Sequence, residues 1–385
     1  MKNSSSRRSF LAAGLAAPAA GMSATSSGLG AASVSPAPLQ GTGKVALSYR
    51  TLGKTGLKVT TVGYGCMITS DASVVSRALD LGITYFDTAR GYMQGNNERM
   101  VGAALGAGRK NITLSSKSHG ATKAEALKEL DTSLKELNTD HLDIWYMHNK
   151  VKPEELSDDL VDAWETAKKQ GKIRFIGVST HDPNPLVDRI LGVGKFDVVL
   201  STFNFTMGTN RDAAFSRLRD AGMGLVAMKV MAPAGRGQAN ATMKREGGPL
   251  AALKWALKNS MISTTVPSMT DMDQLEVNIR AMAEPFTSSD ERLLAALNEE
   301  IRPYYCRMCF RCSGQCPKGL PVADTIRFLS YADFYGQYAL GRERFLELPD
   351  HVRSIRCGDC DSCPVDCPNG VMVRDRLVRA QELFA

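Results

Sequence analysis

Four ionisable side chains stand at or just past the ends of three consecutive strand-like segments. Asp87 and Tyr92 follow the apolar run 83–86, Lys117 ends the next segment, and His148 ends the third. In an α/β barrel, catalytic groups lie at the C-terminal ends of the strands. A tyrosine hydroxyl, with an ordinary pKa of about 10, exchanges protons near neutrality when a buried cation stabilises its phenolate.

The pattern therefore predicts an acid–base site for a carbonyl or an alcohol. In this site Lys117 tunes Tyr92, Asp87 holds Lys117, and a neutral His148 orients a substrate oxygen. Each residue also has a structural alternative: Asp87 as a turn or cap residue, Lys117 as a solvated strand end, and His148 as a satisfied core imidazole. Their occurrence together at consecutive strand ends favours the site.

Eight of the nine cysteines lie beyond residue 305, in two copies of the pattern Cys-x2-Cys-x2-Cys-x3-Cys-Pro. The first copy holds Cys306, Cys309, Cys312 and Cys316, and the second holds Cys357, Cys360, Cys363 and Cys367. This spacing is typical of two [4Fe–4S] clusters, in which the fourth cysteine of each copy reaches the other cluster. Zinc is an alternative, although structural zinc usually draws on two separated cysteine pairs. Disulfides are another, in an oxidising compartment.

The two cysteine loops differ in charge. The first loop carries basic residues and the second acidic ones, namely Arg307, Arg311 and Lys318 against Asp359, Asp361 and Asp366. Because positive charge favours the reduced cluster, the first cluster is expected to have the higher potential. The ninth cysteine, Cys66, follows the first strand and is expected to be a small buried residue, with a thiol at the barrel mouth as the alternative.

Eight strand-like segments alternate with amphipathic helical stretches such as 123–137 and 154–169. The segments are 59–65, 83–89, 112–117, 142–148, 173–179, 196–203, 224–230 and 262–267. This arithmetic predicts a (β/α)8 TIM barrel within the α/β class, and no Gly-x-Gly-x-x-Gly follows any strand to favour a Rossmann domain. We expect the barrel over 44–286, a connecting helix over 287–302, and a small, mainly helical dicluster ferredoxin-type domain over 303–385.

Residues 1–43 are expected to be a signal and linker rather than part of the fold. Ser6-Arg7-Arg8-Ser9-Phe10-Leu11 precedes an Ala/Gly-rich stretch without acidic residues, a pattern similar to a twin-arginine export signal. The alternative is a disordered tail with a chance arginine pair. The apolar part is too short to span a membrane, so we expect a periplasmic protein with no spanning segment after signal removal. No basic run is interleaved with aromatic residues, which argues against nucleic acid as a partner.

Several motifs together resemble the aldo-keto reductase family over residues 48–286. They are Leu-Gly-Lys-Thr-Gly-Leu at 52–57, Phe-Asp-Thr-Ala-Arg-Gly-Tyr at 86–92, Gly-Lys-Ile-Arg-Phe-Ile-Gly-Val-Ser at 171–179, Lys117 and His148. The resemblance implies a (β/α)8 fold, carbonyl reduction by hydride from a nicotinamide, and the catalytic roles given above to Asp87, Tyr92, Lys117 and His148. It also implies NAD(P)H contacts at Ser179, Asn204, Gly235 and Asn278.

The cofactor side departs from the family pattern at five positions. They are Thr180, Leu200 and Met228, where the family usually has an asparagine, a glutamine and an aromatic residue, and Ser268 and Gln274, where it has basic residues for a 2′-phosphate. A preference for NADPH is therefore not expected.

The sequence as a whole predicts an oxidoreductase that interconverts a small-molecule carbonyl and alcohol. Its electrons come from a nicotinamide, from the two clusters, or from both. An external electron donor or acceptor is then an expected partner. The alternative is an electron-transfer or scaffold protein whose barrel is catalytically silent.

Overall fold

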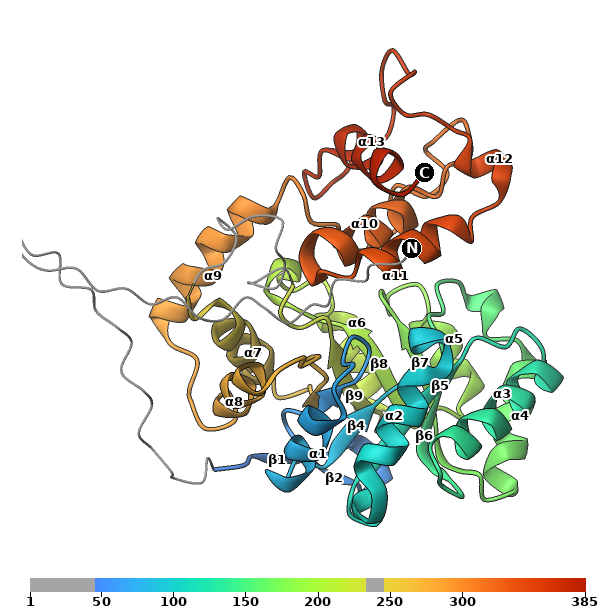
Figure 1. Ribbon diagram of the computed structural model, residues 1–385, viewed down its shortest axis with the longest axis vertical. Helices are drawn as coiled ribbons and strands as arrows, with labels where there is room; N and C mark the ends of the chain where they lie inside the picture. The colour runs from blue at the N-terminus through green and yellow to red at the C-terminus, as the bar shows by residue number, and fades with distance from the viewer. Residues whose placement is uncertain (1–45, 233–245) are drawn as a thin grey trace, which may run out of the picture. The chain divides into compact units, whose positions relative to one another are not determined.

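Eight parallel strands follow one another in chain order around a barrel (Figure 1). They are β3 (Tyr64–Gly65), β4 (Tyr85–Asp87), β5 (Thr113–Ser118), β6 (Leu142–Met147), β7 (Ile173–Thr180), β8 (Val198–Thr202), β9 (Gly224–Met228) and β10 (Thr264–Thr265). Parallel bridges from Val62 to Thr265 and from Gly65 to Ser268 join the first strand to the last. The expected (β/α)8 barrel is therefore confirmed. This computed structural model describes residues 46–232 and 246–385, which lie in one unit, Val45–Ala385.

An antiparallel hairpin precedes the barrel. β1 (Tyr49–Thr51) pairs with β2 (Lys58–Thr60) around the short helix η1 (Gly53–Thr55). The turn approaches the start of β9 so closely that a Cβ on Gly53 would lie 2.3 Å from the backbone nitrogen of Gly224. The predicted first strand, 59–65, was wrong in extent. Its beginning belongs to the hairpin, and the strand that pairs with β4 consists of Tyr64 and Gly65 alone.

The barrel helices are α1 (Ala72–Asp80), α2 (Asn96–Leu105), α3 (Lys123–Glu136), α4 (Asp158–Lys169), α5 (Val187–Val193), α6 (Asp212–Asp220), α7 (Gly248–Lys258) and α8 (Met272–Arg280). Short helices η2 (Tyr92–Gly95), η3 (Gly106–Asn111), η4 (Pro153–Glu155) and η5 (Phe205–Met207) lie in the connections. Local signals set several boundaries. Thr122 and Glu125 form a capping box that starts α3, and Ser157 caps α4. The main apolar core lies between the sheet and these helices, where Trp145 of β6 stacks on Trp164 of α4 at 3.7 Å between ring centroids.

The last part of the described chain is helical. It contains α9 (Ser288–Ile301), α10 (Val322–Tyr335), α11 (Tyr338–Leu346), α12 (Asp350–Arg353) and α13 (Val373–Phe384), drawn in orange to red in Figure 1. Asp333 of α10 accepts hydrogen bonds from Arg376 and Arg379 of α13, both at 2.7 Å. α11 and α12 were not predicted. Within the described residues, no helix combines the length and apolar character that crossing a membrane requires.

The C-terminal helices contact the barrel at its side and at its mouth. α9 packs on α7, where Leu294, Leu297 and Ile301 share an apolar cluster with Ala251 and Ala252. α10 reaches the C-terminal ends of the strands, where an Arg327 guanidinium nitrogen lies 3.2 Å from Nε2 of His181, just after β7. The barrel mouth is therefore bordered by helices that follow it in the sequence.

Candidate active site

The four predicted catalytic residues meet at the barrel mouth. Asp87 ends β4 and Lys117 lies near the end of β5, and both are almost fully buried. The Lys117 ammonium donates to Asp87 Oδ2 at 2.5 Å and to the carbonyl oxygen of Thr88 at 2.6 Å. Ser115 Oγ donates to the other Asp87 oxygen at 2.7 Å. The ion pair is thereby fixed in position on both sides.

Tyr92, the first residue of η2, lies directly beside this ion pair. Lys117 Nζ is 4.9 Å from the centroid of the Tyr92 ring. Burial raises the pKa of Tyr92 to about 12, and the Lys117 charge is the largest influence that opposes this rise. Burial also opposes the charged form of Lys117, but Asp87 and Tyr92 outweigh it and raise the pKa of Lys117.

The expectation that Lys117 brings the pKa of Tyr92 toward neutrality was therefore wrong for the unliganded site, because desolvation of the phenolate outweighs the attraction of the cation. The phenol keeps its proton at neutral pH. This state suits a proton donor to a carbonyl oxygen.

His148 follows β6 and faces Tyr92 edge-on, with 5.9 Å between ring centroids. Its Nδ1 is buried and has no hydrogen-bond partner within the described structure. Burial, followed by the nearby His119 and Lys117, holds the pKa of His148 well below its usual range. A neutral imidazole with a free nitrogen beside Tyr92 is suited to orient a substrate oxygen.

A cavity of about 90 Å³ opens next to these groups. Asp87 and Tyr92 form part of its wall, with Met228 and Lys229 from the end of β9 and Tyr335 from α10. The lining is otherwise largely apolar. Strand ends of the barrel and a C-terminal helix thus enclose one small space beside the Tyr92 ring.

Two of the four residues predicted to contact a nicotinamide use their side chains within the protein. Ser179 Oγ accepts the backbone N–H of Asn149 at 2.8 Å, so it supports the end of β6. Asn204 caps η5 through Thr206 and donates to the Lys229 carbonyl oxygen at 3.0 Å. Both side chains are therefore engaged within the protein. Gly235 lies outside the described residues.

Asn278 of α8 keeps an unused group. Its side chain is 1% exposed, and its Nδ2 has no hydrogen-bond partner among the described residues. A buried amide without a partner costs stability unless a ligand or water satisfies it. Asn278 therefore fits a contact to a bound nucleotide.

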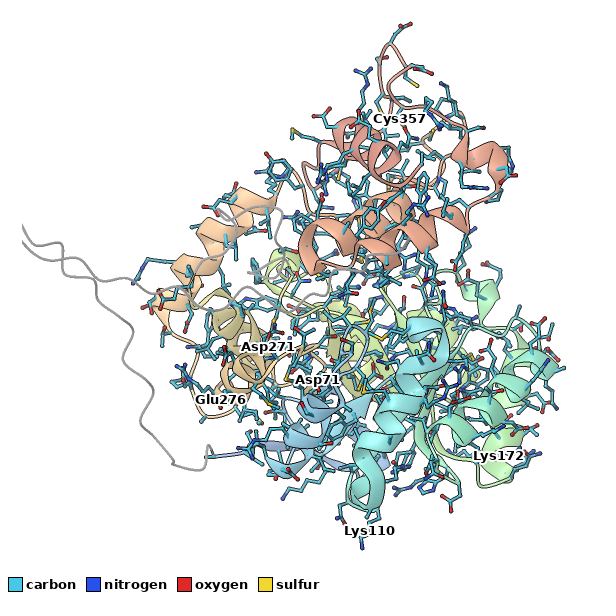
Figure 2. All side chains as sticks on the ribbon, in the orientation of Figure 1. Asp71, Lys110, Lys172, Asp271, Glu276 and Cys357 are labelled. Atoms are coloured by element: carbon cyan, nitrogen blue, oxygen red, sulfur yellow. The ribbon has the colours of Figure 1, made fainter. Side chains whose placement is uncertain are left out.

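The departures from the family pattern have visible consequences. Thr180 Oγ1 donates to the Asp182 carbonyl oxygen at 2.9 Å, and Leu200 is buried in the barrel interior. Gln274 donates to Thr270 Oγ1 at 2.9 Å and to the carboxylate of Asp271, which caps α8. Figure 2 labels Asp271 and Glu276 among the side chains of this region. Ser268 and Gln274 bring no positive charge, and the nearby carboxylate opposes a 2′-phosphate.

The eight C-terminal cysteines lie in two loops around one apolar cluster that includes Leu320, Val352 and Leu377. Figure 2 labels Cys357 in this part of the chain. All nine cysteines of the chain are free thiols, and Cys66 is fully buried, as expected. No group of three or more His, Cys, Asp or Glu side chains is arranged around a single metal ion anywhere in 46–232 or 246–385.

The thiols of the two loops are interleaved. Burial raises the pKa of Cys306 to about 12, and three other thiols add to the rise, those of Cys312, Cys309 and Cys367. Burial also raises the pKa of Cys357, and the thiols that add to this rise are Cys316, Cys360 and Cys363. The fourth cysteine of each loop thus lies with the first three of the other. This donor set fits two [4Fe–4S] clusters of the exchanged type, which spread four thiolates over a larger volume than one ion does.

The charged side chains close to each cysteine loop in the structure are not all those that lie next to it in the sequence. Lys318, counted above with the first loop, contacts the thiol of Cys360 in the second, and this contact raises the pKa of Lys318. Arg374 of α13 donates to the carbonyl oxygens of Gly358 and Cys360 at 3.2 and 2.8 Å. These cations offset the carboxylates of the second loop. The expected difference in cluster potential therefore becomes smaller.

Sequence reasoning missed several residues at the mouth. His119 stacks on His148 at 3.9 Å between centroids, and it lies two residues past Lys117. The strand-end argument could have found His119 and Lys229. The α10 residues Arg327, Tyr331 and Tyr335 carry no such signal, because only the packing of α10 against the barrel brings them to the mouth.

Comparison with known proteins agrees with the barrel fold and with the part of the chain that forms it. Residues 68–249 match the model of the Aldo/keto reductase family. L-galactose dehydrogenase of Arabidopsis thaliana is 27% identical over 306 residues, which cover 67% of this chain and 95% of that protein. The uncharacterized oxidoreductase YqkF of Bacillus subtilis is 28% identical over 221 residues, 51% of this chain and 71% of that protein.

Solved structures show the same fold. The holo form of aldo-keto reductase AKR11C1 from Bacillus halodurans superposes with a TM-score of 0.58 at 24% identity, over 66% of this chain and 96% of that one. An aldo-keto reductase from Klebsiella pneumoniae in complex with NADPH gives a TM-score of 0.55 at 22% identity, over 66% and 95% of the two chains.

Replacing Asp87 with Asn should destabilise the barrel, because it leaves the buried Lys117 ammonium without its counter-charge. Losing one partner of such a pair costs about 3–5 kcal/mol. The free energy of unfolding, followed by the fluorescence of the barrel tryptophans, measures this loss. The matched control is the double variant Asp87→Asn/Lys117→Met, which should recover most of the stability. A single variant as stable as the wild type would contradict the proposed burial of the pair.

Proposed function

From the aldo/keto reductase family domain over residues 68–249, we propose that this chain is an oxidoreductase that interconverts a carbonyl and an alcohol. The observation that carries the proposal is the Asp87–Lys117–Tyr92 arrangement beside a neutral His148 at the barrel mouth. Comparison with the family supports the oxidoreductase class. The residue roles that follow are our assignments.

Tyr92 donates its proton to the carbonyl oxygen as negative charge develops there. Lys117 stabilises the phenolate that results, and Asp87 keeps Lys117 in place and charged. His148 is uncharged, so it can donate a hydrogen bond to a carbonyl oxygen of the substrate or accept one from the alcohol. In the reverse direction, the phenolate takes the proton of the alcohol.

We propose NAD(P)H as a hydride source without a preference for the 2′-phosphate. The support is the unpartnered Nδ2 of Asn278, whereas the side chains of Ser179 and Asn204 are already engaged within the protein and add none. A bound nicotinamide would supply hydride to the carbonyl carbon. Similar solved structures include aldo-keto reductases in complex with NADPH and with NADP, which supports a nucleotide as the cofactor.

We also propose that the eight C-terminal cysteines hold two [4Fe–4S] clusters. Cys306, Cys309, Cys312 and Cys367 would hold one, and Cys357, Cys360, Cys363 and Cys316 the other. Such clusters supply one-electron transfer. The interleaving of thiols from the two loops supports this proposal. The alternative of an electron-transfer protein with a silent barrel is disfavoured by the complete Asp87–Lys117–Tyr92 arrangement.

Export by the twin-arginine route is proposed from the sequence of residues 1–43, which lie outside the described part of the chain. Transport of a folded reporter fused to these residues tests it. The control carries Arg7→Lys and Arg8→Lys, which should block transport. Equal transport of both fusions would contradict the proposed twin-arginine signal.

Tyr92→Phe should abolish carbonyl turnover, because the variant keeps the ring and loses only the proton donor. The expected loss in kcat is at least about 100-fold, the usual contribution of a positioned general acid. The control is Tyr338→Phe on the exposed surface of α11, which should leave kcat unchanged. Near-normal turnover by Tyr92→Phe would overturn the proposed chemistry.

NADH and NADPH should bind with dissociation constants within about tenfold of each other, because no cation is placed for a charge-assisted bond to the 2′-phosphate at Ser268 or Gln274. Fluorescence titration of both nucleotides measures this ratio. In Gln274→Arg the ratio should shift toward NADPH. A wild-type preference for NADPH of 100-fold or more, about 2.7 kcal/mol, would reject the inference.

Anaerobically purified protein should contain about eight iron and eight inorganic sulfide per chain. The exchanged pairing adds a sharper expectation for electron paramagnetic resonance. Cys367→Ala should change the same signal as Cys306→Ala, and Cys316→Ala the same signal as Cys360→Ala. If Cys367→Ala instead changed the signal altered by Cys360→Ala, the exchanged pairing would be wrong.

A further inference from the structure

Lys229 stands at the barrel mouth without a counter-charge from any residue that the structure describes. It follows β9 directly, and its backbone has a φ of 53°, in the left-handed region that non-glycine residues rarely adopt. Its ammonium lies 5.1 Å from the ring centroid of Tyr331 and 5.3 Å from that of Tyr335, both on α10. Across residues 46–232 and 246–385, no ion pair is formed by Lys229. The lysine is thus held beside the cavity by two aromatic rings.

Two arginines from the C-terminal helices approach the same place. Arg327 of α10 donates to Asp324 at 2.7 Å and approaches His181, and its Nε is buried with no partner in the described structure. Arg344 of α11 lies against the segment that leads to Tyr92, since a Cβ on Gly91 would be 3.7 Å from its guanidinium. Its known partner is the half-exposed Glu347.

These three cations surround one phenol, that of Tyr331. Tyr331 is buried, and burial favours its neutral form, yet the charges of Lys229, Arg327 and Arg344 together lower its pKa. Tyr331 in turn acts on the pKa of Tyr92. Lys229 lines the cavity beside Tyr92, Arg344 lies against the segment that leads to Tyr92, and Arg327 lies against His181 at the barrel mouth.

The carboxylates of this region do not balance the positive charge. Asp87 is committed to Lys117, Asp182 is paired with Arg211, and Asp324 is paired with Arg327. Among the described residues, Lys229 has no carboxylate partner, and Nε of Arg327 has no hydrogen-bond partner. Lys229 is only half-buried, but a cation without a counter-charge beside a cavity attracts an anionic ligand.

We propose that Lys229, Arg327 and Arg344 bind an anionic group of the substrate at the barrel mouth. The substrate class is then a carbonyl or alcohol compound that also carries a carboxylate or a phosphate ester. This inference rests on the proposed function, because the anion is placed relative to the Tyr92 proton donor. It also gives the C-terminal helices a role in substrate selection that is separate from electron transfer.

The chemistry of the three side chains suits this group. A guanidinium offers planar paired donors to carboxylate and phosphate oxygens, and such charge-assisted bonds are stronger than neutral ones. Lys229 adds a point charge. The largely apolar cavity beside Tyr92 accommodates the uncharged part of a small substrate.

The test uses the anaerobically purified full chain and matched substrate pairs. Succinic semialdehyde is compared with butanal, and glyceraldehyde 3-phosphate with glyceraldehyde, so that the two arms separate carboxylate from phosphate. The wild type should favour the charged member of at least one pair by about tenfold or more in kcat/KM. In Arg327→Gln and Lys229→Met this ratio should fall toward one, and Lys229→Arg should retain it. The control is Arg342→Gln, an exposed arginine of α11, which should keep the wild-type ratio.

A binding arm separates this inference from the proposed chemistry. Calorimetry should detect succinate or inorganic phosphate binding to the wild type, with loss of binding in the double variant Lys229→Met/Arg327→Gln. If these anions bind while no carbonyl is turned over, the anion site stands and the proposed function falls. Equal kcat/KM for charged and neutral substrates, or variants that weaken NADH binding and leave the ratio unchanged, would overturn the inference.

Discussion

The buried ion pair between Lys117 and Asp87 is the constraint on which the rest of the mouth depends. Both groups are removed from water, so each needs the other, and Ser115 and the Thr88 carbonyl fix their positions. Tyr92 lies against this fixed cation. The same burial that demands the pair also keeps the phenol protonated. The same buried cluster therefore determines the stability of the barrel mouth and keeps Tyr92 in the protonated form that can donate to a carbonyl oxygen.

The C-terminal helices complete the mouth rather than standing apart from it. α10 brings Tyr331, Tyr335 and Arg327 next to barrel residues, and Tyr305 reaches Asn204 at 3.5 Å. Tyr305 directly precedes Cys306, the first cysteine of the first loop. The proposed cluster domain and the proposed carbonyl site are therefore joined by a continuous packed segment. A substitution in the cluster domain is therefore expected to alter the carbonyl site, and the reverse.

Much of the fold could be predicted because its signals are local. The strand-end positions of Asp87, Lys117 and His148 followed from alternating apolar segments, and the structure has them at or next to the ends of β4, β5 and β6. The first barrel strand was misplaced because the hairpin and the strand share one apolar run. α10 ends at Tyr335, where Gly336 adopts a left-handed conformation.

The electrostatics of the site could not be predicted in the same way. Residue types suggested that Lys117 would lower the pKa of Tyr92 toward neutrality, but the size of the opposing desolvation depends on the packed surroundings. The cations on α10 and α11 were invisible for a related reason. Their approach to the mouth is set by contacts between segments far apart in the sequence.

The most direct test of the account is the pH dependence of kcat/KM for carbonyl reduction. A general acid acts only while protonated, so activity is present below its pKa and is lost above it. With the pKa of Tyr92 raised to about 12, the profile should show no loss from Tyr92 ionisation between about pH 6 and pH 9. A profile that falls through pH 7 to 8 and is shifted in Lys117→Met would contradict the buried, protonated Tyr92 on which the account rests.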